Sequence, residues 1–255
     1  MPQPHKVQLV GAGPGSADLL TIRALRAIEG AEALLYDALV GDEILALAPR
    51  RCLKILTGKR SGGVSMKQGE INALMLKLAR KGLKVVRLKG GDPSVFGRSG
   101  EERDYLEANG FEVEIVPGVT AASAAAAQFA FPLSHRGEAR RITFATARVQ
   151  DGAVLESGWS GCADPETTLA LYMSRDAAGP VADRLMAEGR LATTPALAVE
   201  NAGRPEARLI RSTLADLAQD LAEATLSGPV VIVIGPTAAR ALDRQASTEA
   251  VALTG

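Results

Sequence analysis

Residues 85–102 read VVRLKGGDPSVFGRSGEE, and this stretch predicts how the chain folds. An apolar strand runs into the turn at 90–93, Gly-Gly-Asp-Pro, and a second glycine-containing turn leads into a helix that opens at Glu101. Paired glycines permit positive φ and close backbone approach, while Pro93 biases Asp92 toward extended backbone. Because ligands bind at the carboxyl ends of strands in α/β sheets, this loop is a candidate ligand site. A tight connection without a ligand stays open as the alternative.

The composition is that of a folded, globular chain. Of its 255 residues, 47% are hydrophobic and 23% are charged, which allows a sizeable core and excludes a disordered chain. Basic and acidic residues number 29 each, so the net charge of +0 lends no support to nucleic-acid binding. Cys52 and Cys162 are too few for a disulfide framework and have no metal-ligand spacing.

No stretch has the pattern of a signal peptide or a membrane span. The N-terminal MPQPHKVQLVG contains a single Lys and only a short apolar run. The alanine-rich run at 121–130 is broken by Ser123 and Gln128 and falls short of the ~20 apolar residues that span a bilayer. The sequence therefore predicts a cytoplasmic protein with no membrane, nucleic-acid or metal partner.

Strands and helices alternate along the chain. In the first half, apolar runs predict strands, with helices between them, at 7–10, 33–36, 53–56, 85–88 and 112–116. The second half is denser in strands, which are expected at 142–146, 169–173, 196–199, 207–210 and 230–234. Helices are expected at about 180–188 and 214–224, and 150–166 has the composition of a flexible insert. We predict two α/β domains, 1–117 and 118–240, with a cleft between them and a tail at 241–255.

Capping residues predict where two helices of the first domain begin. Ser16 or Asp18 is expected near the N-cap of the first helix, which Gly30 ends. Ser65 and Gln68 have the spacing of a capping box at the start of a later helix.

The glycine loop after the first strand imitates a dinucleotide-binding motif. Gly11 and Gly13 follow a strand, and Asp37 closes the second strand, where an acid would hold a ribose hydroxyl. However, Ser16 stands where the third glycine belongs, and Pro14 removes a backbone donor that a pyrophosphate would need. A nicotinamide-dependent oxidoreductase stays open as a rival function.

Several motifs occur in order over nearly the whole chain. They are Val10-Gly-Ala-Gly-Pro-Gly15, Tyr36-Asp37, Gly58-Lys59-Arg60, Gln68 with Glu70-Ile71-Asn72, Arg87-Leu-Lys-Gly-Gly-Asp-Pro93, Val95-Phe-Gly-Arg98, Val116-Pro-Gly118, Ser134-His-Arg-Gly137 and Thr194-Pro195. Together they resemble the uroporphyrinogen-III C-methyltransferase family, from about residue 7 to residue 235. The first two motifs are shared by the wider class of tetrapyrrole methyltransferases.

The resemblance implies a two-domain α/β homodimer with a cofactor and substrate cleft between its domains. The implied activity is transfer of methyl groups from S-adenosylmethionine to carbons C2 and C7 of uroporphyrinogen III. The products would be S-adenosylhomocysteine and precorrin-2, on the route to sirohaem and cobalamin. A methyltransferase of the same fold that acts on a later precorrin, and a non-catalytic tetrapyrrole-binding protein, stay open as alternatives.

The resemblance also implies roles for individual residues. Asp37 would be the proton acceptor and Lys59 the proton donor. Cofactor contacts are implied at Pro14, Gly90, Gly91, Asp92, Val95, Thr120, Ala121, Met173 and Ala202. Because the substrate carries several carboxylates, the neutral chain must gather cations locally, and we expect substrate contacts at Arg60, Arg98, His135 and Arg136.

Plainer roles remain open for some of these residues. Asp37 could cap the turn that follows it, and Lys59 with Arg60 could form a solvated turn. A methionine that ends an apolar strand, as Met173 does, is more often part of a core. The sequence also departs from the family pattern at Val64, Ser94, Ala147, Arg148 and Ala202. These departures leave turnover and substrate fit less determined than the fold and the cofactor.

Overall fold

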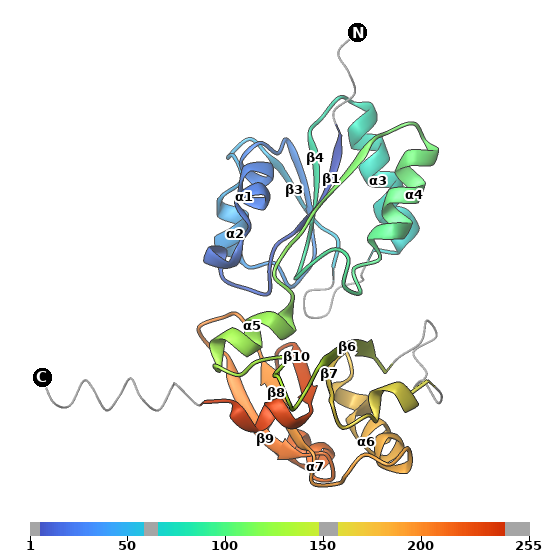
Figure 1. The fold of residues 1–255 in the computed structure, drawn as a ribbon. Helices are drawn as coiled ribbons and strands as arrows, with labels where there is room; N and C mark the ends of the chain where they lie inside the picture. The colour runs from blue at the N-terminus through green and yellow to red at the C-terminus, as the bar shows by residue number, and fades with distance from the viewer. Residues whose placement is uncertain (1–5, 59–65, 148–157, 243–255) are drawn as a thin grey trace, which may run out of the picture. The chain divides into compact units, whose positions relative to one another are not determined.

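The computed structural model describes residues 6–58, 66–147 and 158–242, which form two compact units (Figure 1). The chain divides between Thr120 and Ala121, whereas the sequence places the domain boundary after residue 117. Each unit has its own five-stranded sheet with helices on both faces. The predicted class of two α/β domains is confirmed.

The sheet of the first unit is parallel throughout and has the strand order β3-β2-β4-β1-β5. Its strands are β1 (Val7–Gly11), β2 (Ala33–Tyr36), β3 (Leu53–Leu56), β4 (Val85–Lys89) and β5 (Val113–Val116). β4 is the central strand, and all five of its residues are buried. The stretch at 85–102 therefore begins in the middle of the sheet and leaves it at its carboxyl end.

Helices cover both faces of this sheet because successive strand residues point to opposite sides and both sides are apolar (Figure 1). α1 (Ile22–Glu29) and α2 (Asp42–Ala46) pack against the face that contains Val10, Leu34 and Leu88. α3 (Gln68–Arg80) and α4 (Ser99–Ala108) pack against the face that contains Leu9, Leu35 and Val85.

The predicted cap of the first helix is wrong. A 3-10 helix, η1 (Ala17–Leu19), comes first, and α1 begins only after Thr21. Thr21 has extended backbone, and its Oγ1 accepts a hydrogen bond from the backbone N–H of Ala24 at 3.1 Å, as an N-cap threonine does. Ser16 is the N-cap of η1, but neither Ser16 nor Asp18 caps α1.

The predicted capping box of α3 is also shifted. Gln68 is the first residue of α3, and Lys67 is its N-cap. The Glu70 carboxylate accepts a hydrogen bond from the backbone N–H of Lys67 at 2.7 Å. The reciprocal bond thus comes from Glu70 rather than from Gln68, and Ser65 lies outside the described residues.

The second unit has a mixed sheet with the strand order β6-β7-β10-β8-β9, in which only β6 and β7 are parallel. Its strands are β6 (Arg141–Thr146), β7 (Thr167–Tyr172), β8 (Pro195–Glu200), β9 (Arg208–Thr213) and β10 (Val230–Ile234). Its helices are α5 (Ala121–Gln128), α6 (Ala178–Ala187), α7 (Leu217–Glu223) and the short 3-10 helices η2 (Ser160–Cys162), η3 (Arg175–Ala177) and η4 (Pro236–Arg240).

Two apolar layers enclose the second sheet. α6 and α7 pack against the side of β10 that carries Ile232 and Ile234, and α5 packs against the side that carries Val231 and Val233. Trp159, just before η2, is buried in the layer of α6 and α7. The expectation of a flexible insert is therefore wrong for residues 158–166.

Candidate cofactor and catalytic site

Three glycine-containing loops meet at the carboxyl end of the first sheet. The backbone N–H of Gly13 donates to the carbonyl of Gly91 at 3.2 Å, and that of Gly91 donates to the carbonyl of Gly13 at 2.7 Å. A Cβ on Gly118 would lie 2.3 Å from the Gly91 carbonyl oxygen, and one on Gly11 would lie 2.7 Å from the Gly118 Cα. The loops after β1, β4 and β5 are therefore in backbone contact, which only glycine permits at these positions.

Asp92 ties two of these loops together. Its Oδ2 accepts a hydrogen bond from the backbone N–H of Gly118 at 2.9 Å, and its Oδ1 accepts one from the N–H of Ser94 at 2.7 Å. The second bond closes an Asx-type turn that orders the loop after β4. Because each carboxylate oxygen has two lone pairs, Asp92 keeps acceptor capacity for a cationic ligand.

Several non-glycine residues at positive φ lie in the loops that the sequence predicts to bind the cofactor, while others, such as Ala130 and Thr225, lie elsewhere. Phe96 (φ 54°) and Arg98 (φ 56°) lie beyond β4, and Met173 (φ 52°) directly follows β7. Such backbone costs on the order of 1–3 kcal/mol for a non-glycine residue and persists where the surroundings impose it. The side chain of Met173 is 61% exposed, so the alternative that it belongs to the core is wrong.

Asp37, the predicted base, directly follows β2 and pairs with Arg87 of β4. Arg87 Nη2 donates to Asp37 Oδ1, and Thr57 Oγ1 lies 3.5 Å from the same oxygen. The side chain of Arg87 is 3% exposed, whereas that of Asp37 is 31% exposed. The Asp37 carboxylate therefore extends from a buried partner toward the surface at the carboxyl end of the sheet.

A buried charge cluster, which was not predicted from the sequence, lies behind this pair. Glu102 of α4 accepts from Arg87 Nε at 3.1 Å, from Lys89 Nζ at 3.0 and 2.9 Å, and from Gln68 Nε2 at 3.1 Å. Burial, together with the nearby Arg87 charge, lowers the pKa of Lys89. A signal was present, because Arg87 and Lys89 stand two apart in an otherwise apolar central strand and so share one face.

The turn that carries His135 and Arg136 is held to η4. The backbone N–H of His135 donates to the carbonyl of Ala139 at 2.9 Å, and the Glu138 side chain pairs with Arg240. This pairing lowers the pKa of the Glu138 carboxyl. Glu138 Oε1 also lies 3.7 Å from Nδ1 of His135, so the carboxylate faces both side chains.

The predicted site residues fall into two groups, one in each unit. Those of the first unit lie in the loops that follow β1, β2, β4 and β5: Pro14, Asp37, Gly90, Gly91, Asp92, Val95, Arg98 and Thr120. Those of the second unit lie at the start of α5, before β6, and directly after β7 and β8: Ala121, His135, Arg136, Met173 and Ala202. The predictions for Lys59, Arg60, Val64 and Arg148 fall outside the described residues.

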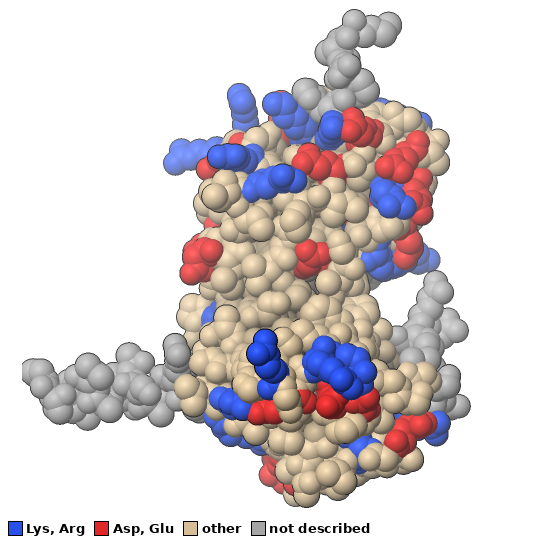
Figure 2. All heavy atoms as spheres, in the orientation of Figure 1, with Lys and Arg blue, Asp and Glu red and all other residues tan. Residues whose placement is uncertain are grey.

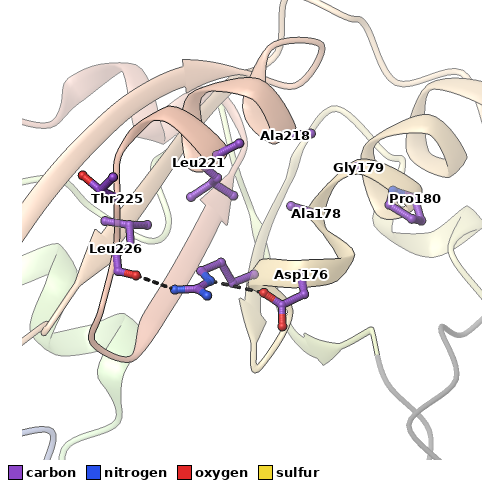
Figure 3. Close-up of a pocket in the computed structure, with 10 residues that line it drawn as sticks. Asp176, Ala178, Gly179, Pro180, Ala218, Leu221, Thr225 and Leu226 are labelled. Atoms are coloured by element: carbon purple, nitrogen blue, oxygen red, sulfur yellow. Dashed lines mark hydrogen bonds and ion pairs between the residues drawn. The ribbon is translucent and has the colours of Figure 1, made fainter.

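A separate hollow of ≈ 460 Å³ is lined by η3, the start of α6, α7 and the residues that follow α7 (Figure 3). At this hollow Arg175 donates to the carbonyl of Leu226 at 2.8 Å and to Asp176 at 3.3 Å. Of the predicted site residues that the structure describes, none lines this hollow.

Basic and acidic side chains are intermixed on the visible face of each unit (Figure 2). Figure 2 shows basic and acidic side chains on both units, in keeping with the net charge of +0. Within the described ranges, no helix is both long and apolar enough to cross a membrane. Among the same residues, no group of three or more His, Cys, Asp or Glu could hold a metal ion.

Residues 6–218 match the family of Tetrapyrrole (Corrin/Porphyrin) Methylases, and the chain belongs to this family. It is 42% identical over 238 residues to the uroporphyrinogen-III C-methyltransferase of Paracoccus denitrificans, covering 93% of this chain and 83% of that protein. It is 43% identical over 237 residues to the chloroplastic S-adenosyl-L-methionine-dependent uroporphyrinogen III methyltransferase of Arabidopsis thaliana. That match covers 91% of this chain but only 63% of the plant protein's length.

A solved structure has the same fold. The uroporphyrin-III C-methyl transferase of Thermus thermophilus, complexed with S-adenyl homocysteine, superposes with a TM-score of 0.79 at 38% identity. The match covers 91% of this chain and 98% of the Thermus chain. The resemblance that the motifs indicate is therefore confirmed.

Proposed function

We propose that this chain is an S-adenosylmethionine-dependent methyltransferase that converts uroporphyrinogen III to precorrin-2 by methylation at C2 and C7. The observation that carries the proposal is its 42% identity, over 93% of its length, to a relative named for methylation of this substrate. The product would serve sirohaem and cobalamin synthesis.

The loops of the first unit fit the cofactor. Gly91 has a φ of 71° and no heavy atom within 4 Å of where its Cβ would stand, so a ligand has room against its backbone. Asp92 offers negative charge to the ammonium group of the cofactor. When bound, the cofactor supplies an electrophilic methyl group. The contacts that we propose are Pro14, Gly90, Gly91, Asp92, Val95, Thr120, Ala121, Met173 and Ala202.

The remaining residues act on the substrate. Methyl transfer to a fully substituted pyrrole carbon leaves a cation in the ring system, which becomes neutral by losing a proton from another position of the macrocycle. The partly exposed Asp37 carboxylate is the proposed acceptor of that proton. Lys59 is the proposed proton donor. The proposed partners of the substrate carboxylates are Arg60, Arg98, His135 and Arg136. The protein contributes mainly by positioning the reactants, since the pyrrole carbon is itself electron-rich.

We propose that the protein is a cytoplasmic homodimer, as the family resemblance implies. Light scattering coupled to size-exclusion chromatography tests the dimer, and a monomer at micromolar concentration would contradict it.

The glycine loop after β1 does not support the alternative function of a nicotinamide-dependent oxidoreductase. The N–H of Ala12 donates to the Lys89 carbonyl at 2.8 Å, the N–H of Gly13 donates to Gly91, and Pro14 has no N–H. These successive positions therefore cannot cradle a pyrophosphate as the dinucleotide motif does. α1 begins only at Ile22, so its N-terminus does not directly follow the loop.

Incubating the protein anaerobically with uroporphyrinogen III and methyl-labelled S-adenosylmethionine tests the proposed function. We expect two labelled methyl groups per tetrapyrrole, counted by mass spectrometry. Cofactor binding without transfer would favour a binding protein, and transfer only to a later precorrin would overturn the proposed substrate. Tight binding of NAD without binding of S-adenosylmethionine would contradict the proposed methyltransferase function.

Asp92→Ala should weaken the binding of S-adenosylhomocysteine about 10-fold to 100-fold, the usual range for losing a hydrogen bond to a charged group. The variant loses both the charge offered to the cofactor and the bond that holds Gly118. Asp37→Ala should change this affinity far less, and the exposed Asp104→Ala on α4 is the control. Isothermal titration decides between these expectations. Equal losses in Asp92→Ala and Asp37→Ala would contradict the assignment of Asp92.

A further inference from the structure

Glu102 is the most deeply buried member of the charge cluster beneath Asp37. Its side chain is 0% exposed, although it comes from the first turn of a helix whose neighbouring Glu101 lies at the surface. Glu102 has no direct bond to Asp37 among the described contacts, so any influence on Asp37 passes through another residue. That residue is Arg87, which bonds both carboxylates.

The guanidinium of Arg87 is held at all three of its nitrogens. Nε donates to Glu102 at 3.1 Å, Nη1 donates to the carbonyl of Leu88 at 3.2 Å, and Nη2 donates to Asp37 Oδ1. Because the guanidinium is planar and rigid, fixing two of its nitrogens fixes where the third one points. Glu102 and the strand backbone therefore determine where Arg87 presents Nη2 to Asp37.

Glu102 also forms an ion pair with the second buried cation, Lys89. Lys89 Nζ lies 3.0 and 2.9 Å from its two carboxylate oxygens, and Lys89 stands on the same face of β4 as Arg87. Without Glu102, two buried cations would have Asp37 as their remaining carboxylate partner in the cluster, and Lys89 would compete with Arg87 for it. The carboxylate of Glu102 thus keeps Lys89 directed away from Asp37.

We infer that Glu102 is a positioning residue for methyl transfer, which acts through Arg87 to hold the Asp37 carboxylate in the orientation that accepts the substrate proton. This inference rests on the proposed function, in which Asp37 is that acceptor. Gln68 supports Glu102 from α3, since its side-chain amide donates to Glu102 at 3.1 Å and to Asn72 Oδ1 at 2.9 Å. The cluster thereby links α3 and α4 to the end of β2.

A double-mutant cycle separates positioning from a purely structural role. Glu102→Gln keeps the shape of the side chain but removes its charge. Arg87→Lys keeps the positive charge but lacks the planar guanidinium that bonds Asp37 and Glu102 at the same time. Each is made alone and together with Asp37→Asn. Glu107→Gln, an exposed residue of the same helix, is the control. Circular dichroism and titration with S-adenosylhomocysteine show which variants are folded with an intact cofactor site.

We expect Glu102→Gln and Arg87→Lys to slow single-turnover methyl transfer about 100-fold, as a displaced catalytic group does, with the affinity for S-adenosylhomocysteine retained. In the Asp37→Asn background, neither should cause a further loss. Additive losses, or a loss that parallels weakened cofactor binding, would overturn the inference while leaving the proposed function intact. If Asp37→Asn itself is fully active, the role of Asp37 as proton acceptor fails instead.

Discussion

Gly118→Ala is expected to destabilise the first unit by about 3 kcal/mol and to abolish cofactor binding. The new Cβ would stand 2.3 Å from the carbonyl oxygen of Gly91 and 2.9 Å from the Cα of Gly11. Both neighbours are backbone atoms, so no side chain can move aside, and overpacking of this kind costs about 1–3 kcal/mol or more. The loops after β1, β4 and β5 must then separate, which also breaks the bond between Gly118 and Asp92.

Gly100→Ala provides the matched control in the same unit. Gly100 lies in α4, and a Cβ there would meet no heavy atom within 4 Å. Because alanine is a better helix former than glycine, we expect a gain of about 1 kcal/mol. Urea denaturation of both variants measures the difference, and titration with S-adenosylhomocysteine measures binding. If Gly118→Ala unfolds at the same urea concentration as the parent protein, the three loops are not in the contact described.

Glu102→Ala should lower the free energy of unfolding by about 3–5 kcal/mol, because it leaves two buried cations without their carboxylate. Arg87 and Lys89 are each almost fully buried, and without Glu102 the partly exposed Asp37 would be the one carboxylate among the described residues left to neutralise both. Glu107→Ala on the exposed side of the same helix removes only a surface pair and should cost less than about 1 kcal/mol. Chemical denaturation compares the two variants.

A charge-free cluster tests the cause of that loss. Replacing Arg87 and Lys89 with methionine and Glu102 with leucine removes the buried charges together, and such replacements are often neutral or stabilising. We therefore expect the triple variant to regain most of the stability lost in Glu102→Ala. A triple variant as unstable as the single one would show that shape, rather than charge, accounts for the loss.

The strands were the most predictable part of the fold. The run Val230–Ile234 is wholly apolar, and its predicted range coincides with β10. β9 (Arg208–Thr213) is an edge strand with polar residues, and the predicted range 207–210 covers only its beginning. A buried central strand is recognised by its continuous apolar run. An edge strand pairs with a single neighbour and contains polar residues, so its hydrophobic pattern is weaker.

The internal structure of the candidate site was much less predictable. The motifs pointed to the Gly91 loop and to Asp37, but Arg87, which holds Asp37, lies 50 positions away along the chain. Pairs at that separation depend on which strands become neighbours, and the order β3-β2-β4-β1-β5 is not visible in local patterns. The predicted helix caps were wrong because both helices begin later in the chain than expected. Thr21 is the N-cap of α1, and Lys67 is the N-cap of α3.

The contact among Gly11, Gly91 and Gly118 has a consequence for engineering this protein. Three segments distant in the sequence share one point of contact, so a library that varies the loop after β4 also changes what the loops after β1 and β5 must accommodate. Randomising one loop at a time would discard most variants for steric reasons alone. Substrate range is better redesigned at an exposed position without an assigned cofactor contact, such as Phe96, with these glycines left unchanged.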